Sequence, residues 1–127
     1  MKSQLVIALL AAAANARSLS TRTAESNLFS GDGTYFSPGT SACREQNTSR
    51  DLIAALNAPQ YGDITAVSPH CGRCALVRGP LGQAKVKIVD ACPECVLGSL
   101  DLSLAAFEQI AHKLEGRVKI IWEFVAC

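Results

Sequence analysis

The segment CGRCALVRGPLGQAKVKIVDACPEC, residues 71–95, begins and ends with a CxxC motif. The two motifs are CGRC at 71–74 and CPEC at 92–95. Two such pairs at this separation are typical of a zinc ribbon, but the same cysteines can also form a redox dithiol or structural disulfides. The spacing alone leaves a metal site, a redox site and a set of cross-links open.

The first residues of the chain predict a secreted protein. Lys2 supplies a positive charge, residues 5–14 are all apolar, and the sequence ANA at 14–16 is a small-x-small cleavage site. This arrangement is typical of a signal peptide, and the apolar run is too short for a membrane span, which needs ~20 residues. We therefore expect residues 1–16 to be a signal peptide and the mature protein to be extracellular.

Secretion favours one interpretation of the cysteines. The chain has six cysteines, and an oxidising compartment favours disulfides over the deprotonated thiolates that zinc requires. A redox dithiol needs its CxxC motif at the start of a helix, whereas CPEC at 92–95 runs into Gly and Ser and is expected to lie in a loop. We expect three disulfides, no metal and no cofactor. The residues alone do not choose among the many pairings that six cysteines allow.

Composition predicts a short leader followed by one domain. Residues 17–30 are rich in Ser, Thr and charged residues, so we expect a flexible leader, and residues 31–127 have the length of a single domain. The formal net charge of +1, without a basic run, argues against nucleic acid or an anionic membrane as a partner. We expect the protein to be a monomer.

Hydrophobic patterning and turn residues predict that the domain is mainly β. The expected strands are 33–36, 63–67, 74–78, 84–90 and 117–125, and the expected helices are 51–57 and 103–116. Ser103 is a suitable N-cap for the second helix, whose apolar stripe comprises Leu104, Phe107, Ile110, Ala111 and Leu114.

The alternation of side chains along the expected strands predicts that two particular residues face the core. In strand 84–90, Asp90 falls in the inward row with Val86 and Ile88. In the last strand, Trp122 has apolar neighbours two residues away on each side and is expected in the core. Asp90 is therefore a candidate for a partly buried carboxylate with a specific role.

Three stretches together resemble a known class of proteins. They are GDGTYFSPGTSAC at 31–43, the segment 71–95, and LDLSLAAFEQIAHKLEGRVKIIWEF at 100–124. In this order they resemble barwin, the expansins and bacterial rare lipoprotein A, and above all the single-domain fungal members such as the loosenins. The most specific signal is a strand ending in V-D-x-C, preceded by C-G-x-C and followed by L-D-L-S. The resemblance implies a six-stranded double-psi β-barrel with short helical insertions.

The resemblance also implies a disulfide pairing, because barwin-like proteins link the two cysteines of C-G-x-C to partners near the two ends of the domain. Carried over, the pairs are Cys43–Cys71, Cys74–Cys127 and Cys92–Cys95. The first two would close long loops, while the third would shape the loop beside Asp90.

The implied site is a polysaccharide groove. Asp101 matches the essential acid of the family and Asp90 its second aspartate, while Thr34 and Tyr35 match the opposite wall and Ser103 follows in the same motif. The residues by themselves leave a simpler interpretation open, in which Asp101 caps the helix and Asp90 accepts a structural hydrogen bond. A carboxylic acid that works near neutral pH needs a raised pKa, which partial burial beside a second carboxylate would supply.

Three functions remain open on this basis. The first is a secreted expansin-like protein that binds and loosens glucan or chitin without hydrolysis. The second is an effector or defence module, such as a cysteine-protease inhibitor or a barwin-like carbohydrate binder, whose partner is a host protein or a glycan. The third is a lytic glycosidase. Cys92 stands where expansins often have an aromatic residue, and we expect no second carbohydrate-binding domain, so the expected polysaccharide affinity is weak.

Two further features have simple interpretations. Asn47 begins an Asn-Thr-Ser sequon and is a candidate glycosylation site. His70 and His112 are far apart in the chain, and we expect neither to be a ligand.

Overall fold

The computed structural model describes residues 27–127. The expected signal peptide, 1–16, and most of the expected leader lie outside the described residues. Within the described range, no helix has the length and apolar character needed to cross a membrane. The first strand begins at Phe29, so Phe29 and Ser30 belong to the barrel and not to the leader.

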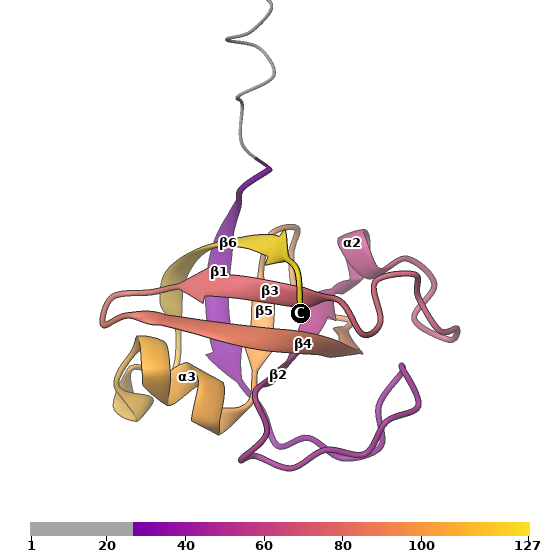
Figure 1. Ribbon diagram of the computed structural model, residues 1–127, viewed down its shortest axis with the longest axis horizontal. Helices are drawn as coiled ribbons and strands as arrows, with labels where there is room; N and C mark the ends of the chain where they lie inside the picture. Colours follow the sequence, from indigo (N-terminus) through magenta and orange to yellow (C-terminus); the bar gives the residue numbers. More distant parts are fainter. Residues whose placement is uncertain (1–26) are drawn as a thin grey trace, which may run out of the picture.

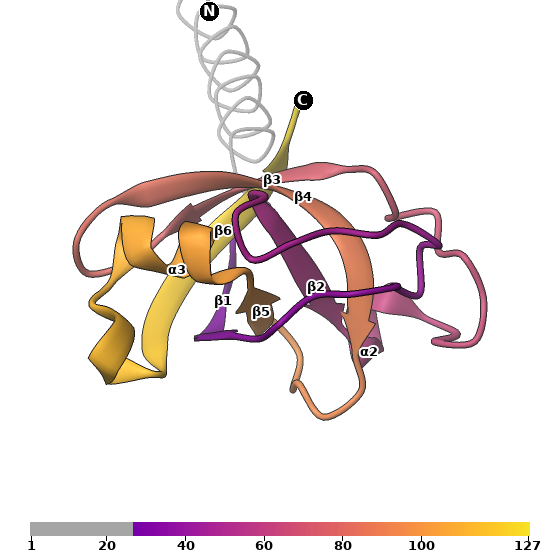
Figure 2. The same ribbon diagram turned by 90° about the horizontal axis from the view of Figure 1, so that it is seen from below.

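Six strands close into a mixed parallel and antiparallel barrel (Figure 1). The strands are β1 (Phe29–Tyr35), β2 (Ile53–Asn57), β3 (Cys74–Arg78), β4 (Gln83–Cys92), β5 (Leu100–Leu102) and β6 (Val118–Val125). Around the barrel they follow the order β1-β5-β2-β4-β3-β6. The short helices α2 (Ala58–Tyr61) and α3 (Leu104–Ile110) lie at opposite ends (Figures 1 and 2). The prediction of a mainly β, six-stranded barrel with short helical insertions is confirmed.

Strand β2 was predicted as a helix, and this prediction is wrong. All five residues from Ile53 to Asn57 are buried because β2 lies between β4 and β5 inside the closed sheet. A strand covered on both faces reads as a continuous apolar run without alternation, and such a run cannot be distinguished from a buried helix by periodicity. The three-residue strand β5 was not predicted, and residues 63–67 form turns instead of the expected strand.

The helix predicted over 103–116 is shorter than expected. Ser103 is its N-cap as predicted, and its hydroxyl accepts a hydrogen bond from the Ala106 N–H at 3.3 Å. The helix ends at Ile110, the chain turns extended at Ala111, and a separate 3₁₀ turn, η1, covers Lys113–Glu115. Leu114 is therefore 98% exposed and does not belong to the apolar stripe.

The barrel interior is filled by large side chains from almost every strand. Trp122 is fully buried, as predicted, and donates its indole N–H to the Gly98 carbonyl at 2.8 Å. Phe107 of α3 and Tyr61 of α2 are also buried and close the two ends. The core thus connects β6 directly to the loop that precedes β5.

Three disulfides join all six cysteines, in the pairs that the resemblance implied: Cys43–Cys71, Cys74–Cys127 and Cys92–Cys95. The sequence separations are 28, 53 and 3 residues. The cysteines are therefore not thiolate ligands or a free dithiol in this structure, and the described residues contain no group of three or more His, Cys, Asp or Glu side chains placed to hold a metal ion.

Candidate functional site

The pairing of β1 with β5 brings Thr34 and Asp101 together from opposite ends of the chain. Strands β1 and β5 run parallel, and Thr34 of β1 pairs with Asp101 of β5. The Thr34 hydroxyl donates a hydrogen bond of 2.8 Å to the Asp101 carboxylate. Asp101 therefore has a fixed orientation, and it is a strand residue, which rules out the helix-cap interpretation because Ser103 is the cap.

Asp101 has an environment that disfavours its charge. Burial raises the pKa of Asp101 above its ordinary value, and the negative charges of Glu94 and Asp90 act in the same direction. The hydrogen bond from Thr34 and the positive charge of Arg117 act in the opposite direction to a smaller extent than burial. Asp101 consequently keeps its proton to a higher pH than an exposed aspartate does.

The Asp101 side chain lines a cleft of about 370 Å³. Thr34 and Tyr35 line the cleft, and the other polar residues are Asp32, Glu94, Ser99 and Arg117. The Cys92–Cys95 disulfide and Val96 also form part of the lining. Tyr35 is held by packing on the Phe107 ring, with 4.9 Å between the ring centroids.

Close backbone contact fixes the loop on one side of the cleft. Gly98 has φ of +87°, and a Cβ there would lie 2.1 Å from the Ser30 carbonyl oxygen. A Cβ on Gly31 would in turn lie 2.5 Å from the Gly98 carbonyl. Only glycine permits this approach. Just beyond it, the Ser99 hydroxyl accepts the Asp32 N–H at 3.1 Å, so the loop is joined to β1.

The other side of the cleft carries an ion-pair cluster. Asp32 is bound by Lys119 at 2.8 Å and by Arg117 at 3.1 Å. The hydrogen bond from Lys119 is the main reason that the pKa of Asp32 lies below its ordinary value. Among the described residues, Asp101 and Glu94 have no such ion-pair partner. The cleft therefore offers a ligand two carboxyl groups that are not in an ion pair.

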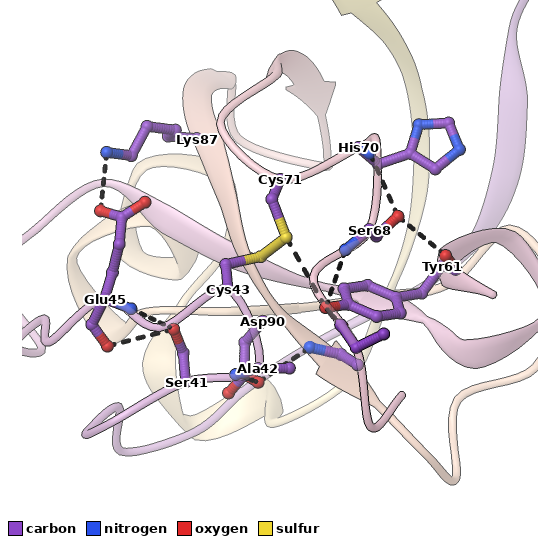
Figure 3. Close-up of a disulfide and its surroundings, with 12 residues drawn as sticks. Ser41, Ala42, Cys43, Glu45, Tyr61, Ser68, His70, Cys71, Lys87 and Asp90 are labelled. Atoms are coloured by element: carbon purple, nitrogen blue, oxygen red, sulfur yellow. Dashed lines mark hydrogen bonds and ion pairs between the residues drawn. A yellow bond between two sulfur atoms is a disulfide. The ribbon is translucent and has the colours of Figure 1, made fainter. Parts of the chain in front are cut away.

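Asp90 lies outside this cleft, so the expectation that it lines the same groove is not met. An irregularity in the β2–β4 pairing places Ala54 opposite Ile88 and Ala55 opposite Asp90, which leaves Val89 as an extra residue. The extra residue shifts the alternation, so Val89 is buried and Asp90 does not continue the inward row. The Asp90 carboxylate accepts the Ala42 N–H at 2.9 Å (Figure 3).

Asp90 nevertheless remains near Asp101 through the sheet. Ala55 of β2 pairs with Asp101 on one side and with Asp90 on the other. The two aspartates are thus separated by two strand spacings, about 10 Å. The structural interpretation of Asp90, a carboxylate that fixes the loop carrying Cys43, agrees with this geometry.

Ser103 also lies outside the cleft. It is fully buried, and its hydroxyl accepts the Ala106 N–H, so it is not accessible to a polysaccharide. Asn47 lies in the long connection between β1 and β2, and its side-chain amide donates to Asp51 at 3.4 Å. Its glycosylation stays a prediction.

Sequence reasoning missed four polar residues of the cleft. Glu94 lies between the two cysteines of CPEC, and Asp32 stands two positions before Thr34, so an inspection of the motif neighbours would have found both. Arg117 is 85 residues from its partner Asp32. No local signal identifies Arg117 or Ser99, because β1–β6 pairing and the Gly98 crossing bring them to the cleft.

The barrel and the cleft can be compared with known proteins. No protein-family model matches the chain. Over 75 residues it is 36% identical to Expansin-YoaJ of Bacillus subtilis, a match that covers 58% of this chain and 32% of that protein. A crystal structure of a Clavibacter michiganensis expansin, an aspartate-to-asparagine mutant in complex with cellohexaose, has a TM-score of 0.69 at 26% identity and covers 77% of this chain and 50% of that chain.

Two other solved structures have the same barrel. The Streptomyces papain inhibitor has a TM-score of 0.71 at 29% identity and covers 78% of this chain and 94% of that chain. The fungal elicitor cerato-platanin, at 18% identity and a TM-score of 0.52, shows the fold alone.

These similarities define the class of the described domain as a double-psi β-barrel. More particularly, the domain is similar to the expansins in sequence and in fold. It spans only 32% of Expansin-YoaJ and 50% of the Clavibacter expansin, so the activities of those longer proteins do not transfer automatically. The three disulfides are consistent with an extracellular protein.

Proposed function

We propose that this protein is secreted, acts as a monomer, and binds and loosens cell-wall polysaccharide, glucan or chitin, without hydrolysis. The observation that carries the proposal is the Thr34–Asp101 pair in an open cleft. The similar barrel of the Clavibacter expansin was crystallised with cellohexaose, which supports a glycan as the ligand.

The chemistry of the cleft suits sugar hydroxyls. Asp101 accepts hydrogen bonds when ionised and donates one when protonated, and its raised pKa keeps the protonated form to a higher pH than in an exposed aspartate. The Thr34 hydroxyl and the Arg117 guanidinium add further polar contacts along the cleft. Competition between these groups and the hydrogen bonds between neighbouring polysaccharide chains would loosen a wall without breaking a covalent bond.

The direct test measures binding to insoluble cellulose and chitin by pull-down, together with weakening of filter paper. We expect weak but measurable binding that Asp101→Asn changes and that the matched control Glu108→Gln does not, since Glu108 is exposed on α3 away from the cleft. Release of soluble sugars would instead indicate a lytic glycosidase, for which Glu94 would be the second carboxyl group in the cleft.

A cysteine-protease inhibitor is the second candidate function. It is favoured by the Streptomyces papain inhibitor, because the chain covers 94% of that protein but only half of the Clavibacter expansin. Titration against papain distinguishes the two. Stoichiometric inhibition, with no retention on cellulose or chitin, would replace the polysaccharide proposal.

A further inference from the structure

Arg73, which lies between the two cysteines of the CGRC motif, is held by a disulfide on each side. Cys71 is joined to Cys43, and Cys74 to Cys127. The backbone between them is also paired with β4, because the Gly72 N–H donates to the Ile88 carbonyl and the Ile88 N–H donates to the Arg73 carbonyl, each at 2.8 Å. The backbone of this exposed arginine is therefore fixed on both sides.

His70 stands beside this segment and is anchored in turn. Its backbone N–H donates to the Ser68 hydroxyl at 3.1 Å, and that hydroxyl donates to the Tyr61 carbonyl at 2.8 Å. Figure 3 shows these bonds, with the imidazole of His70 pointing away from the Cys43–Cys71 disulfide. Both side chains therefore project from a rigid loop.

Arg73 and His70 both lie against the ring of Phe124. The guanidinium carbon is 3.7 Å from the ring centroid, and the imidazole is stacked on the ring at a centroid distance of 5.2 Å and an angle of 7°. A contact of 3.1 Å joins Arg73 Nη1 to His70 Nδ1 and requires that both groups lie on the same face of Phe124. Together they form one layer over that face.

The protonation state of His70 follows from this contact. Arginine only donates hydrogen bonds, so Nδ1 must be the acceptor, and the imidazole is neutral with its proton on Nε2. Burial, and then the charge of Arg73, lower the pKa of His70, in agreement with a neutral ring. The positive charge of the layer therefore resides on Arg73.

These groups line a second cleft, of about 470 Å³, with Phe29, Gln60 and Asn27. The Gln60 side-chain oxygen already accepts a hydrogen bond from Asn57 at 2.6 Å, which leaves its NH₂ group as a donor. Among the described residues, no carboxylate lines this cleft and Arg73 has no ion-pair partner. The cleft presents a guanidinium, an imidazole N–H and an amide, all of them donors.

We propose that this cleft binds the carboxylate of an acidic sugar, a uronic acid unit of a wall polysaccharide. Beyond the Nη1 contact with His70, the guanidinium of Arg73 keeps further N–H donors, and a guanidinium edge matches a carboxylate with two parallel hydrogen bonds. Phe29 and Phe124 supply apolar surface for the sugar ring, and the Gln60 amide reaches a hydroxyl or ring oxygen.

The choice of a sugar as the carboxylate carrier rests on the proposed function, but the site is separate from the Asp101 cleft. Phe29 and Thr34 line the two clefts and are five residues apart on β1, roughly 17 Å at about 3.3 Å per residue. The Asp101 cleft contains two carboxyl groups outside any ion pair, and its one guanidinium, Arg117, is already paired with Asp32, so the cleft disfavours a uronate. The two sites thus divide neutral from acidic sugars.

The test is a titration with a short galacturonic acid oligomer, followed by the amide resonances of the full mature protein and by calorimetry. We expect shifts at Cys71–Cys74 and Phe124, and an affinity at least tenfold lower in Arg73→Gln. Arg73→Lys should also weaken binding, because an ammonium lacks the planar fork. Arg50→Gln, an exposed arginine outside both clefts, is the matched control and should bind like the parent.

Several results would overturn the proposal. They are unchanged affinity in a folded Arg73→Gln variant, an equal loss in Arg50→Gln, or equal binding of a neutral cello-oligomer at the same resonances. Equal affinity for acetate, or for a peptide with a free C-terminal carboxylate, would exclude the sugar. Asp101→Asn should leave uronate binding intact, so failure of the glucan or chitin proposal is recognised independently of this site.

Discussion

The two CxxC motifs have the same spacing but opposite structural roles. Both cysteines of CGRC pair with distant partners, across 28 and 53 residues, whereas the cysteines of CPEC pair with each other. The first motif ties the long β1–β2 connection and the C-terminus to the barrel. The second closes a small loop in the lining of the Asp101 cleft. One sequence pattern therefore serves stability in one place and the shape of a cleft in the other.

The largest predicted effect is loss of the Cys74–Cys127 bridge. Loop-closure entropy for a separation of 53 residues corresponds to about 4 kcal/mol, a large part of the stability of a small domain. Cys74→Ser combined with Cys127→Ser should lower the urea midpoint accordingly, measured by circular dichroism. If this variant lost less stability than one without the Cys92–Cys95 bridge, the stabilising role would belong to CPEC and not to CGRC.

The indole of Trp122 is predicted to stabilise the connection between β4 and β5 more than the Cys92–Cys95 disulfide in that connection does. Trp122→Phe removes the bond to the Gly98 carbonyl and leaves a buried acceptor unpaired, which costs about 1–3 kcal/mol in addition to the lost packing. Because Trp122 is the chain's one tryptophan, unfolding must be followed by circular dichroism and not by its fluorescence.

Amide exchange distinguishes the hydrogen bond from a general loss of packing. In Trp122→Phe, exchange of the Ser99 amide, which donates to the Val96 carbonyl, should be accelerated. Ile88→Val, a small cavity elsewhere in the core, should leave that amide unaffected. Equal acceleration in both variants would mean that the loop depends on global stability alone.

A smaller effect is expected for the Cys92–Cys95 bridge. Its loop of 3 residues corresponds to about 2 kcal/mol at most. Cys92→Ser with Cys95→Ser should fold normally but show faster exchange in the loop and weaker binding to cellulose or chitin. Global unfolding of the double variant at room temperature would show that this bridge also supports the barrel.

Elements with a local signal could be predicted from the sequence, whereas elements set by a distant partner could not. The β3–β4 hairpin, β6 and the Ser103 cap have local signals, namely alternation, turn residues and a capping side chain. β2 was mistaken for a helix because both of its faces are buried, and Asp90 was misplaced because the extra residue Val89 has no local signal. A bulge is decided by the pairing partner, which lies elsewhere in the chain.

Some residues of the candidate site were found through motif resemblance, whereas others are placed only by closure of the barrel. Thr34, Tyr35 and Asp101 were expected in one groove and do line one cleft. That expectation came from motif resemblance, because residues 67 positions apart have no sequence signal of contact. Arg117 and the Arg73–His70 layer depend on the barrel closing. Strand order and register, which a single sequence does not encode locally, place these side chains.

The smallest predicted effect on stability belongs to Asp101→Asn. Asparagine keeps the size of the side chain, and its amide oxygen can still accept the Thr34 hydroxyl, so the change in unfolding free energy should stay within about 1 kcal/mol. Binding to cellulose or chitin should nevertheless change, because the variant neither carries a charge nor donates an acid proton. Melting curves and pull-downs on the same samples test both parts.

The pH dependence of this variant provides the sharpest check on Asp101. Because burial raises its pKa, the folded chain holds a proton at pH values where the unfolded chain has lost it. Ionisation therefore lowers the parent's stability as the pH rises from the unfolded pKa, about 3.9, and the cost is complete above the folded pKa. Asparagine avoids this cost, so the stability of the variant relative to the parent should increase as the pH rises from the unfolded pKa through the raised folded pKa. A relative stability that decreases over this range would mean that Asp101 is stabilised as a carboxylate, and the cleft would then hold a permanent charge instead of a titratable acid.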